Sequence, residues 1–546
     1  MAKHLGRLTP PTMPSTSLGY VLLVVCVIAL IGLTSPVRSL AQETTSSATS
    51  RQETAGRGHH RYKLIDLGTF GGPRSYFSPG SGNDIGQYSH VLNERGEVAG
   101  LANTALPDPF PPFCADLEGD CLVTHAFEAH GGGGLMDLGA LPGGGSSAAT
   151  WISGNGLIAG LSQNGEIDPL VPQFQFAENR AVLWRKGEII DLGTLPEGGY
   201  ESYAAAVNSR GQVVGAAINT VPDSNSMGNF WLGPPFPFET RAFLWEEDKG
   251  MQDLGTLPGG TDAQAILINE AGQVVGYSYT GSTNAIGCGA GEGTSFSLET
   301  GSFIWEKGKG MRDLGTLGGT CTTASDMNDR GQIVGGSHLA GDQSGRAFLW
   351  DNGAMHDLGG SLGGSFTGAF ALNEAGRAVG FAYLPGDTTF HATLWKQIGQ
   401  LTDLGVLGGD QCSYATSINA RMQIVGGSIS DCTNFVGFRA FLWEDGAMLD
   451  LNALIPSDAT LHLQTIETIN NRGEIAGQAV DVQNNQHAVL LIPCDKGHPD
   501  VEGCDYSTVD PVPASQRPAA TAIQSHQAPT AVLQRLGTRR FSIRQP

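Results

Sequence analysis

One short motif, Asp-Leu-Gly followed closely by a Gly-Gly doublet, returns eight times along this chain of 546 residues. The copies begin at Asp66, Asp137, Asp191, Asp253, Asp313, Asp357, Asp403 and Asp450, and the last has lost its doublet. A period of roughly 45 to 70 residues with a constant core and elastic spacers is the signature of a repeat architecture. A conventional fold built around one catalytic site is therefore not expected.

Two further motifs accompany the copies. The pattern N-x-x-G-x-V-V-G, with small or apolar residues at the two Val positions, begins at Asn93, Asn208, Asn269, Asn328, Asn373 and Asn470. The pattern x-A-F-L-W stands at residues 241–245, 346–350 and 439–443, with looser versions at His125, Arg180, Gly301, His391 and His487. An Asn that bonds to its own backbone and a Gly that tolerates positive φ predict a tight hairpin turn in the first pattern.

Each repeat contains four short apolar runs separated by glycine-bearing turns, which predicts four strands. In one repeat these runs are residues 347–350, 355–358, 370–372 and 377–379. A four-stranded antiparallel sheet cannot bury both faces alone, so the sheets must stack, and a ring leaves none exposed. Half-repeats at residues 62–67 and 487–492 could pair and close that ring. We expect an all-β, eight-bladed β-propeller over residues 62–493, with an open β-repeat solenoid as the alternative.

The combination of R-A-F-L-W, M-x-D-L-G-T-L-G-G and I-N-x-x-G-Q-V-V-G resembles the HAF-repeat family of predicted extracellular bacterial proteins. The family is named for a His-Ala-Phe that stands here at residues 125–127. The resemblance covers about residues 62–492, although Arg replaces the His at Arg180, Arg241, Arg346 and Arg439. It implies export and a repeat architecture, and it implies no particular activity.

The two ends of the chain differ from the repeats. Lys3 and Arg7 precede an apolar run at residues 18–33 and a small-residue exit, which predicts a cleaved signal peptide at residues 1–41. An uncleaved N-terminal anchor is the alternative. We assign residues 42–61 to a linker, 494–510 to a disulfide-bearing extension and 511–546 to a disordered basic tail. The expected location is extracellular or periplasmic, without stable membrane insertion after cleavage.

Charge and cysteine content narrow the choice of partner. Without the signal and the tail, 23 basic residues remain against 53 acidic ones, so the core carries about −30 and nucleic acid is disfavoured. Eight cysteines remain after Cys26, an even number that predicts disulfides in an exported protein. Proximity suggests the pairs Cys114 with Cys121, Cys288 with Cys321, Cys412 with Cys432, and Cys494 with Cys504. Because no C-x-x-C pair occurs, zinc is not expected.

Because strand direction alternates within each blade, every type of connection is expected on one particular face of the ring. Both hairpin turns fall on one face, and the doublet loops fall on the other with the connections from V-V-G to A-F-L-W. Those connections have 19 to 25 residues in the first four repeats and 9 to 12 in the last four. Loops on a rigid scaffold often carry binding, and aromatics offer large contact area. The candidate binding residues are Phe110, Phe113, Phe174, Phe176, Trp231 and Phe236; the alternative is that these rings bury one another.

Catalytic spacing is missing from the sequence. It contains no G-x-S-x-G, H-E-x-x-H or phosphate-binding loop, and we predict no cofactor and no metal site. The eight Asp-Leu-Gly carboxylates are expected to accept hydrogen bonds from N–H groups of the following Gly-Gly loop. Calcium at Asp116, Glu118 and Asp120 is a minor alternative to a solvated acidic loop.

The favoured function is a secreted or surface-associated scaffold that binds a carbohydrate, peptide or matrix ligand on its long-loop face. The alternative is an extracytoplasmic propeller hydrolase or lyase whose acid and base come from separate loops. A separation of about 5 to 9.5 Å between carboxylates such as Asp168 and Asp223 would favour that alternative. A purely structural assembly is a third possibility.

Overall fold

The computed structural model describes residues 61–77, 90–110, 120–131, 133–227, 237–283, 298–499, 501–502 and 504. The chain divides into two compact units, Met1–Gly56 and Arg57–Pro546, and all described residues belong to the second. The expected signal peptide, the linker up to residue 60 and the basic tail therefore lie outside the described residues. Within the described ranges, no helix is both long enough and apolar enough to span a membrane.

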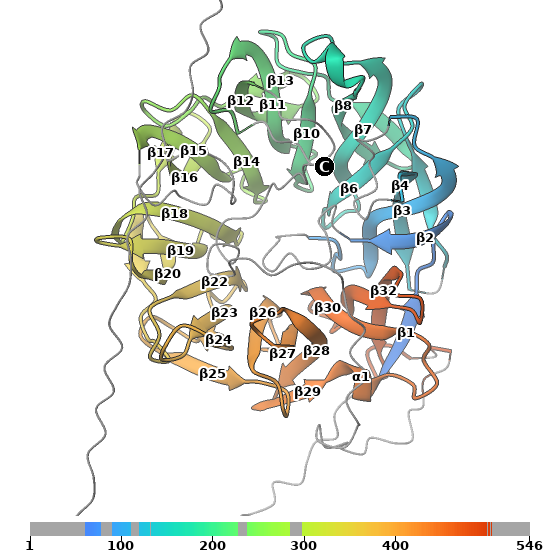
Figure 1. Ribbon diagram of the computed structural model, residues 1–546, viewed down its shortest axis with the longest axis vertical. Coiled ribbons are helices and arrows are strands. Elements are labelled where there is room, and N and C mark those ends of the chain that lie inside the picture. Colours follow the sequence, from blue (N-terminus) through green and yellow to red (C-terminus); the bar gives the residue numbers. More distant parts are fainter. Residues whose placement is uncertain are drawn as a thin grey trace, which may run out of the picture. The chain divides into compact units, whose positions relative to one another are not determined.

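Eight four-stranded antiparallel sheets form the fold, and we number them blades 1 to 8 in chain order (Figure 1). Blades 1 to 4 comprise β2 (Gly71–Tyr76), β3 (Glu97–Pro107), β4 (Leu122–His130) and β5 (Met136–Gly139); β6 (Ser147–Ile152), β7 (Ile158–Ile167), β8 (Ala177–Arg185) and β9 (Glu188–Asp191); β10 (Ser202–Val207), β11 (Val213–Pro222), β12 (Phe238–Glu246) and β13 (Gly250–Asp253); β14 (Ala263–Ile268), β15 (Val274–Thr283), β16 (Leu298–Glu306) and β17 (Gly310–Asp313).

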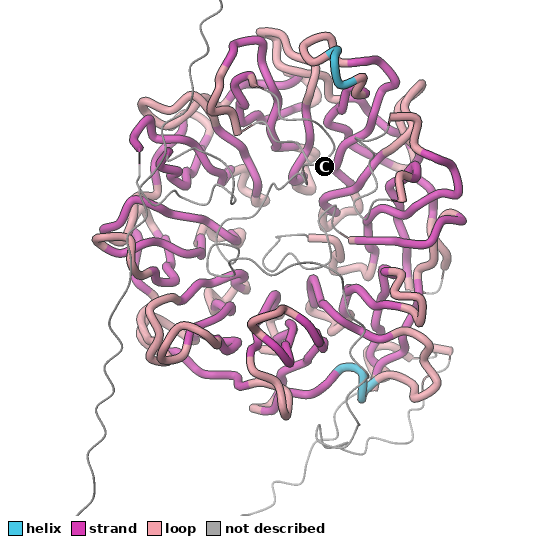
Figure 2. Tube along the Cα trace, in the orientation of Figure 1, coloured by secondary structure: helices cyan, strands magenta, loops and turns pink. Residues whose placement is uncertain are grey.

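Blades 5 to 8 continue the series. They comprise β18 (Gly318–Met327), β19 (Ile333–Leu339), β20 (Gly345–Asp351) and β21 (Ala354–Asp357); β22 (Thr367–Leu372), β23 (Ala378–Tyr383), β24 (Phe390–Trp395) and β25 (Leu401–Gly405); β26 (Cys412–Ile418), β27 (Ile424–Asp431), β28 (Val436–Glu444) and β29 (Ala447–Asp450); and β30 (His462–Ile469), β31 (Ile475–Val480) and β32 (Gln486–Pro493) with β1 (Tyr62–Asp66). Two helical turns, η1 (Pro172–Phe174) and α1 (Leu451–Leu454), interrupt the described strands (Figure 2).

Blade 8 closes the ring across the two ends of the propeller. Its outermost strand is β1, which pairs antiparallel with β32 from Tyr62 opposite Pro493 to Asp66 opposite Val489. Further backbone bonds extend the ladder at both ends, from Cys494 N to Arg61 O at 2.8 Å and from Leu67 N to Ala488 O at 3.1 Å. The predicted eight-bladed propeller and its mode of closure are confirmed. The ring in Figure 1 excludes the open solenoid.

The blades are offset by two strands from the repeat as we grouped it. The four runs at residues 347–350, 355–358, 370–372 and 377–379 belong to two different sheets, β20 and β21 of blade 5 and β22 and β23 of blade 6. The grouping was wrong because the Gly-Gly loop is not a hairpin. It leads from the outermost strand of one blade to the innermost strand of the next, so the strands on either side of it are not neighbours in a sheet.

The core lies between neighbouring blades. Alternate residues of the A-F-L-W strands point to opposite faces of a sheet, and both faces are covered. In β12, Ala242, Phe243, Leu244 and Trp245 are all buried, at 0 to 7% exposure. One apolar cluster runs without a break from Trp151 of blade 2 to Trp350 of blade 5. This packing explains why these strands are apolar throughout instead of alternating with polar residues.

The last glycine of V-V-G is required by close packing within the sheet. A Cβ on Gly335 would lie 2.0 Å from the Thr323 carbonyl oxygen and 2.9 Å from the ring of Phe348. The next residue, Gly336, has no atom within 4 Å of its ideal Cβ position. The same approach to a carbonyl oxygen, at 1.9 to 2.0 Å, occurs at Gly160, Gly215, Gly276, Gly380 and Gly426.

The asparagines of N-x-x-G form a ring of hydrogen bonds from blade to blade. Each side-chain oxygen accepts N–H bonds from its own turn, and each side-chain nitrogen donates to the carbonyl of the equivalent residue in the next blade, at 3.0 to 3.3 Å. Asn470 of blade 8 donates to Asn93 of blade 1 at 3.0 Å and so completes the circuit. Blade 2 has Ser153 at this position, and there Asn155 makes the contact to Ser209 O at 2.8 Å. The members are Asn93, Ser153, Asn208, Asn269, Asn328, Asn373, Asn419 and Asn470.

Candidate functional site on the long-loop face

The eight Asp-Leu-Gly carboxylates are used by the fold. In every repeat, the aspartate accepts a hydrogen bond from the backbone N–H two residues later, at 2.7 to 2.9 Å. The expected structural role is therefore confirmed, but the donor is the residue after the Leu and not the Gly-Gly doublet. Several carboxylates also bind the first residue of H/R-A-F: His125 lies 2.9 Å from Asp137, and Arg241 lies 2.9 Å from Asp253. The spacing of the two motifs in the sequence does not indicate this contact.

Four consecutive blades differ from the others on the opposite face from the hairpin turns. In blades 1 to 4 the second and third strands are 9 to 11 residues long, whereas they have 6 to 9 residues in blades 5 to 8. A part of the extra length that the sequence assigned to loops is thus strand. We call this side of the ring the long-loop face. It consists of the connections between the second and third strands of blades 1 to 4, with the adjoining strand ends and the neighbouring Gly-Gly loops.

Three aspartates occupy equivalent positions on this face. The backbone N–H groups of Asp108, Asp168 and Asp223 bond to Cys121 O, Phe176 O and Pro237 O, at 2.8 to 3.0 Å. One carboxylate oxygen of each then accepts the N–H two residues later, at 2.6 to 2.9 Å, and starts the loop with an Asx turn.

The second carboxylate oxygen reaches the next blade in Asp108 and Asp223. Asp108 Oδ2 lies 3.3 Å from the Ser146 hydroxyl, and Asp223 Oδ2 accepts from the Thr261 hydroxyl at 2.6 Å. Asp168 instead contacts the carboxyl group of Glu201. Each loop is therefore tied to the following blade. Asp168 and Asp223 have separate partners, and their predicted use as an acid and base pair stays a prediction.

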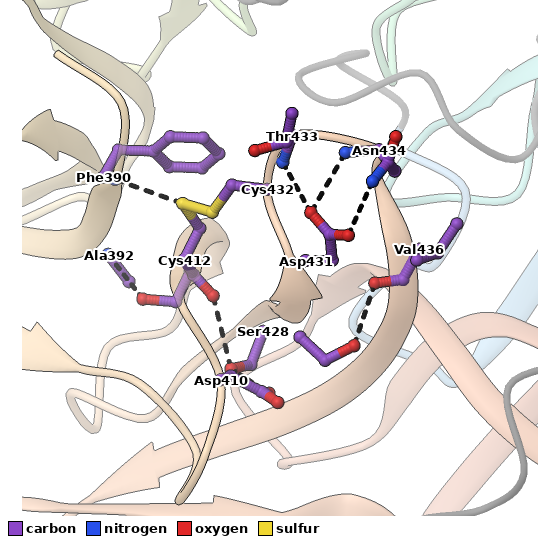
Figure 3. The surroundings of a disulfide bond; sticks show 12 residues. Phe390, Ala392, Asp410, Cys412, Ser428, Asp431, Cys432, Thr433, Asn434 and Val436 are labelled. Carbon is purple, nitrogen blue, oxygen red and sulfur yellow. Dashed lines mark hydrogen bonds between the residues drawn. A yellow bond between two sulfur atoms is a disulfide. The ribbon is translucent and has the colours of Figure 1, made fainter. Parts of the chain in front are cut away.

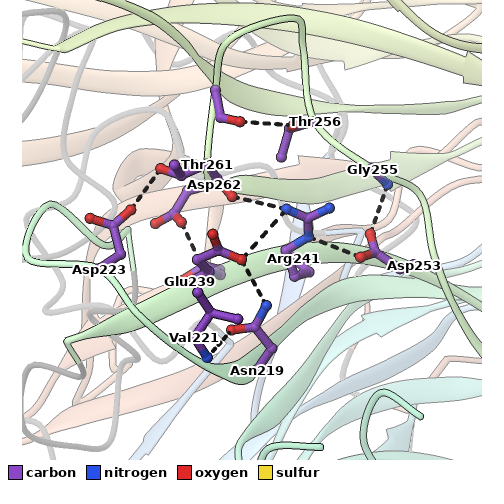
Figure 4. A network of polar contacts seen from close by, with 12 residues as sticks. Asn219, Val221, Asp223, Glu239, Arg241, Asp253, Gly255, Thr256, Thr261 and Asp262 are labelled. Carbon is purple, nitrogen blue, oxygen red and sulfur yellow. Dashed lines mark hydrogen bonds and ion pairs between the residues drawn. The ribbon is translucent and has the colours of Figure 1, made fainter. Parts of the chain in front are cut away.

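The most extensive polar network on this face surrounds Arg241 (Figure 4). The guanidinium lies 2.9 Å from Asp253 and 3.8 Å from Glu239, and it donates to Thr261 O at 3.1 Å. Asn219 donates to Glu239 at 2.8 Å. The network joins blade 3 to the Gly-Gly loop that leads into blade 4, and its net charge is negative.

Asp262 lies directly beside this network and is fully buried. It accepts the backbone N–H of Thr240 at 3.1 Å and that of Met227. Burial, assisted by the nearby charge of Asp223, raises the pKa of Asp262 to about 7. Such a carboxyl group can hold or release a proton at neutral pH, which general acids require. Asp223 is only partly buried, so it is the more accessible member of the pair.

The predicted aromatic residues are only partly described. Phe176 is fully buried in a cluster with Tyr76, Val171 and Tyr203, and the partly buried Phe174 packs against that cluster. The burial of Phe176 agrees with the packing alternative for that ring. Phe110 is partly buried. Phe113, Trp231 and Phe236 lie outside the described residues, and ligand binding by this group stays a prediction. Of the minor calcium alternative, only Asp120 is described, and Arg74 contacts it at 2.6 Å.

Two predicted disulfides are present. Cys412 at the start of β26 pairs with Cys432 in the connection between β27 and β28, and Phe390 N donates to Cys412 Sγ at 3.2 Å (Figure 3). The second bond joins Cys494 and Cys504 beyond the last strand. Cys121 and Cys321 are also disulfide-bonded. Their predicted partners, Cys114 and Cys288, lie outside the described residues.

One described group combines three possible metal ligands, Glu97, Glu128 and His130. In other blades, two of these three positions hold a pair of residues that stabilises the sheet. Gln212 donates to Glu246 at 3.1 Å and Gln273 donates to Glu306 at 3.1 Å, both joining the start of the second strand to the end of the third. In blade 1, Glu97 and His130 take these two positions, so the carboxylate and imidazole replace an amide and carboxylate pair.

His90 makes a contact that the sequence did not indicate. Its ring stacks on Trp151 of blade 2 with 4.0 Å between centroids, and its Nε2 lies 3.8 Å from Asp326 of blade 5. Asp326 is itself fixed by the N–H of Leu372 at 2.9 Å. The connection between β2 and β3 thereby links blade 2 to blade 5 through inward-facing strands.

No family model matches the sequence, and no curated protein matches it. Among solved structures, the Dos1 propeller aligns over 79% of this chain and 95% of its own, at 9% identity and a TM-score of 0.41. The dipeptidyl peptidase 4 of Porphyromonas gingivalis aligns over 74% and 59%, at 7% identity and 0.41. A gluconolactonase from Xanthomonas campestris aligns over 64% and 90%, at 11% identity and 0.25. These similarities carry no conclusion about function.

Proposed function

We propose that the protein is a secreted or surface-associated scaffold that binds a carbohydrate, peptide or matrix ligand on its long-loop face. One observation carries the proposal: four adjacent blades have lengthened second and third strands, and four do not. The residues that recur in all blades are engaged in hydrogen bonds of the fold. The parts of the chain that vary between blades are therefore the ones available for recognition.

Export is part of the same proposal. Disulfides persist in oxidising compartments, and two of the four predicted pairs are present. The apolar run near the N-terminus and the resemblance to HAF-repeat proteins support the same location. We infer that each HAF repeat in this chain supplies four strands of the eight-bladed ring.

The test is binding of the purified full chain to glycan and peptide arrays. Trp231→Ala and Phe236→Ala should each weaken binding of any hit about tenfold or more, because truncating a central aromatic contact costs over 1 kcal/mol. Val482→Ala is the matched control, since Val482 is 77% exposed on the equivalent connection of a blade with a short hairpin. Unchanged binding with a lowered melting temperature in the two aromatic variants would leave them a packing role only.

A second candidate function is hydrolysis or elimination at the Asp223 and Asp262 pair. The observation in its favour is the buried acid with a pKa of about 7 beside a partly exposed carboxylate. A panel of glycoside, ester and peptide substrates should then give turnover that Asp262→Asn and Asp223→Asn both abolish. Turnover that survives either substitution, or no turnover from the folded protein, rejects this function and leaves the binding proposal intact.

A further inference from the structure

The three loop aspartates provide an internal comparison between blade junctions. At the first and third junctions, the aspartate meets a hydroxyl donor, Ser146 or Thr261. At the junction between blades 2 and 3, Asp168 meets Glu201, which offers a second acceptor in place of a donor. At this junction the loop aspartate therefore meets a carboxyl group directly, whereas Asp223 at the next junction acts on Asp262 through its charge.

Three oxygen atoms at this junction receive no hydrogen bond from any described residue: Asp168 Oδ2, Glu201 Oε1 and Asn179 Oδ1. The three residues are 0%, 1% and 1% exposed, so solvent does not reach them. The amide of Asn179 lies against the pair, because its Nδ2 and its backbone N–H donate to Glu201 Oε2 at 3.1 and 3.0 Å. Buried acceptors without donors are unfavourable, and a proton, an ordered water or a cation would each relieve them. One buried donor without a partner, Gln163 Nε2, belongs to the residue paired with Asn179 in the sheet.

The guanidinium of Arg180 acts on Asp168 through its charge, but its hydrogen bonds go to other groups. Arg180 donates to Tyr200 O at 2.5 Å and to Glu178 at 2.6 Å. A proton shared between the carboxyl groups would satisfy Asp168 and Glu201, and burial together with Asp168 does raise the pKa of Glu201. That proton would still leave the amide oxygen of Asn179 without a partner. A cation held between the two carboxyl groups would also offer a partner to the amide oxygen of Asn179.

We propose that Asp168, Asn179 and Glu201 bind a hard divalent cation, with Ca²⁺ as the favoured ion. Two carboxylates and an amide oxygen form an oxygen-only donor set, which hard cations prefer over transition metals. The ion would fasten the blade 2 hairpin to the start of blade 3. This position is distinct from the acidic sequence between Cys114 and Cys121.

The experiment measures the melting temperature and calorimetric heat of the EDTA-treated full chain on addition of CaCl₂, with MgCl₂ in parallel. We expect about one ion bound per chain and a rise of about 3 °C at a hundredfold excess over Kd. Glu201→Gln should abolish the response, because the amide of glutamine can donate directly to Asp168. Asp262→Asn, the equivalent position at the next junction, should retain it.

Asn179→Thr gives a second variant in which both carboxyl groups remain. Thr124 and Thr240 occupy this position in blades 1 and 3, so the substitution is compatible with the fold. Loss of the amide oxygen should weaken Ca²⁺ affinity about tenfold. The proposal is overturned if the wild-type chain responds to neither ion, which leaves the shared proton. It is equally overturned if Glu201→Gln and Asn179→Thr both keep the full response, which places the ion elsewhere.

Discussion

The asparagine ring makes a quantitative prediction for Asn470, which closes the circuit between blades 8 and 1. The side chain is 5% exposed and makes four hydrogen bonds. It donates to Asn93 O at 3.0 Å and Glu474 Oε2 at 2.7 Å, and it accepts from Arg472 N and Glu474 N at 3.0 Å each. At about 1 kcal/mol net per bond, Asn470→Ala should lower the free energy of unfolding by about 4 kcal/mol.

Asn470→Asp separates the contributions. Its carboxylate keeps both bonds to the turn N–H groups but loses the donors and faces the carboxylate of Glu474, so at least half of the loss should remain. The matched control is Asn208→Ala, because Asn208 makes the same four bonds at a junction that does not involve the chain ends. Its effect should agree with that of Asn470→Ala within about 1 kcal/mol, since like substitutions at separate sites act independently.

Guanidinium chloride unfolding, followed by tryptophan fluorescence and circular dichroism, measures these differences. A loss below about 1 kcal/mol for Asn470→Ala, under one quarter of the four-bond sum, would refute the idea that the ring stabilises closure. A large loss at Asn470 with none at Asn208 would instead limit the contribution to the joint between the two ends of the propeller.

Three further predictions follow from the packing, the buried acid and the disulfide. Gly335→Ala should destabilise by about 3 kcal/mol or more by overpacking, while the adjacent Gly336→Ala should change stability by less than about 1 kcal/mol; equal melting temperatures would contradict the close approach. The pKa of Asp262 is raised in the folded state, so the fold is stabilised when this carboxyl group is protonated, and stability should fall as the pH rises from about 4 to 7. Asp262→Asn should flatten this pH dependence of the melting temperature. An unchanged pH dependence in the variant would assign the effect to other groups. Replacing Cys412 and Cys432 together by Ala should cost about 3 kcal/mol in denaturant unfolding, and no loss would mean that the link constrains little.

The architecture could be predicted because its determinants are local and repeated. The N-x-x-G turn fixes which strands form one hairpin of each blade, and the half-repeats at both ends indicate closure. The blade boundaries could not be assigned in the same way. A Gly-Gly loop has the composition of a tight turn, and only the pairing of β18 to β21 within one sheet reveals that it connects two blades.

The candidate site was less accessible from sequence because its contacts cross between blades. Asp168 was singled out, but its partner Glu201 lies 33 residues later and is positioned by the packing of blade 3 against blade 2. A signal was present: Glu201 and Asp262 both stand two residues after a Gly-Gly doublet, where Ser146 and Cys321 also stand. Glu201 and Asp262 are the acidic residues at this position, and both side chains are buried.

The direction of the closing ladder decides how the propeller responds to tension. Because Tyr62 lies opposite Pro493, the chain enters and leaves blade 8 at the same end of the β1 and β32 pair. A load applied at both ends of the propeller would open this pair one bridge at a time, as in unzipping, and would not shear all the bridges together.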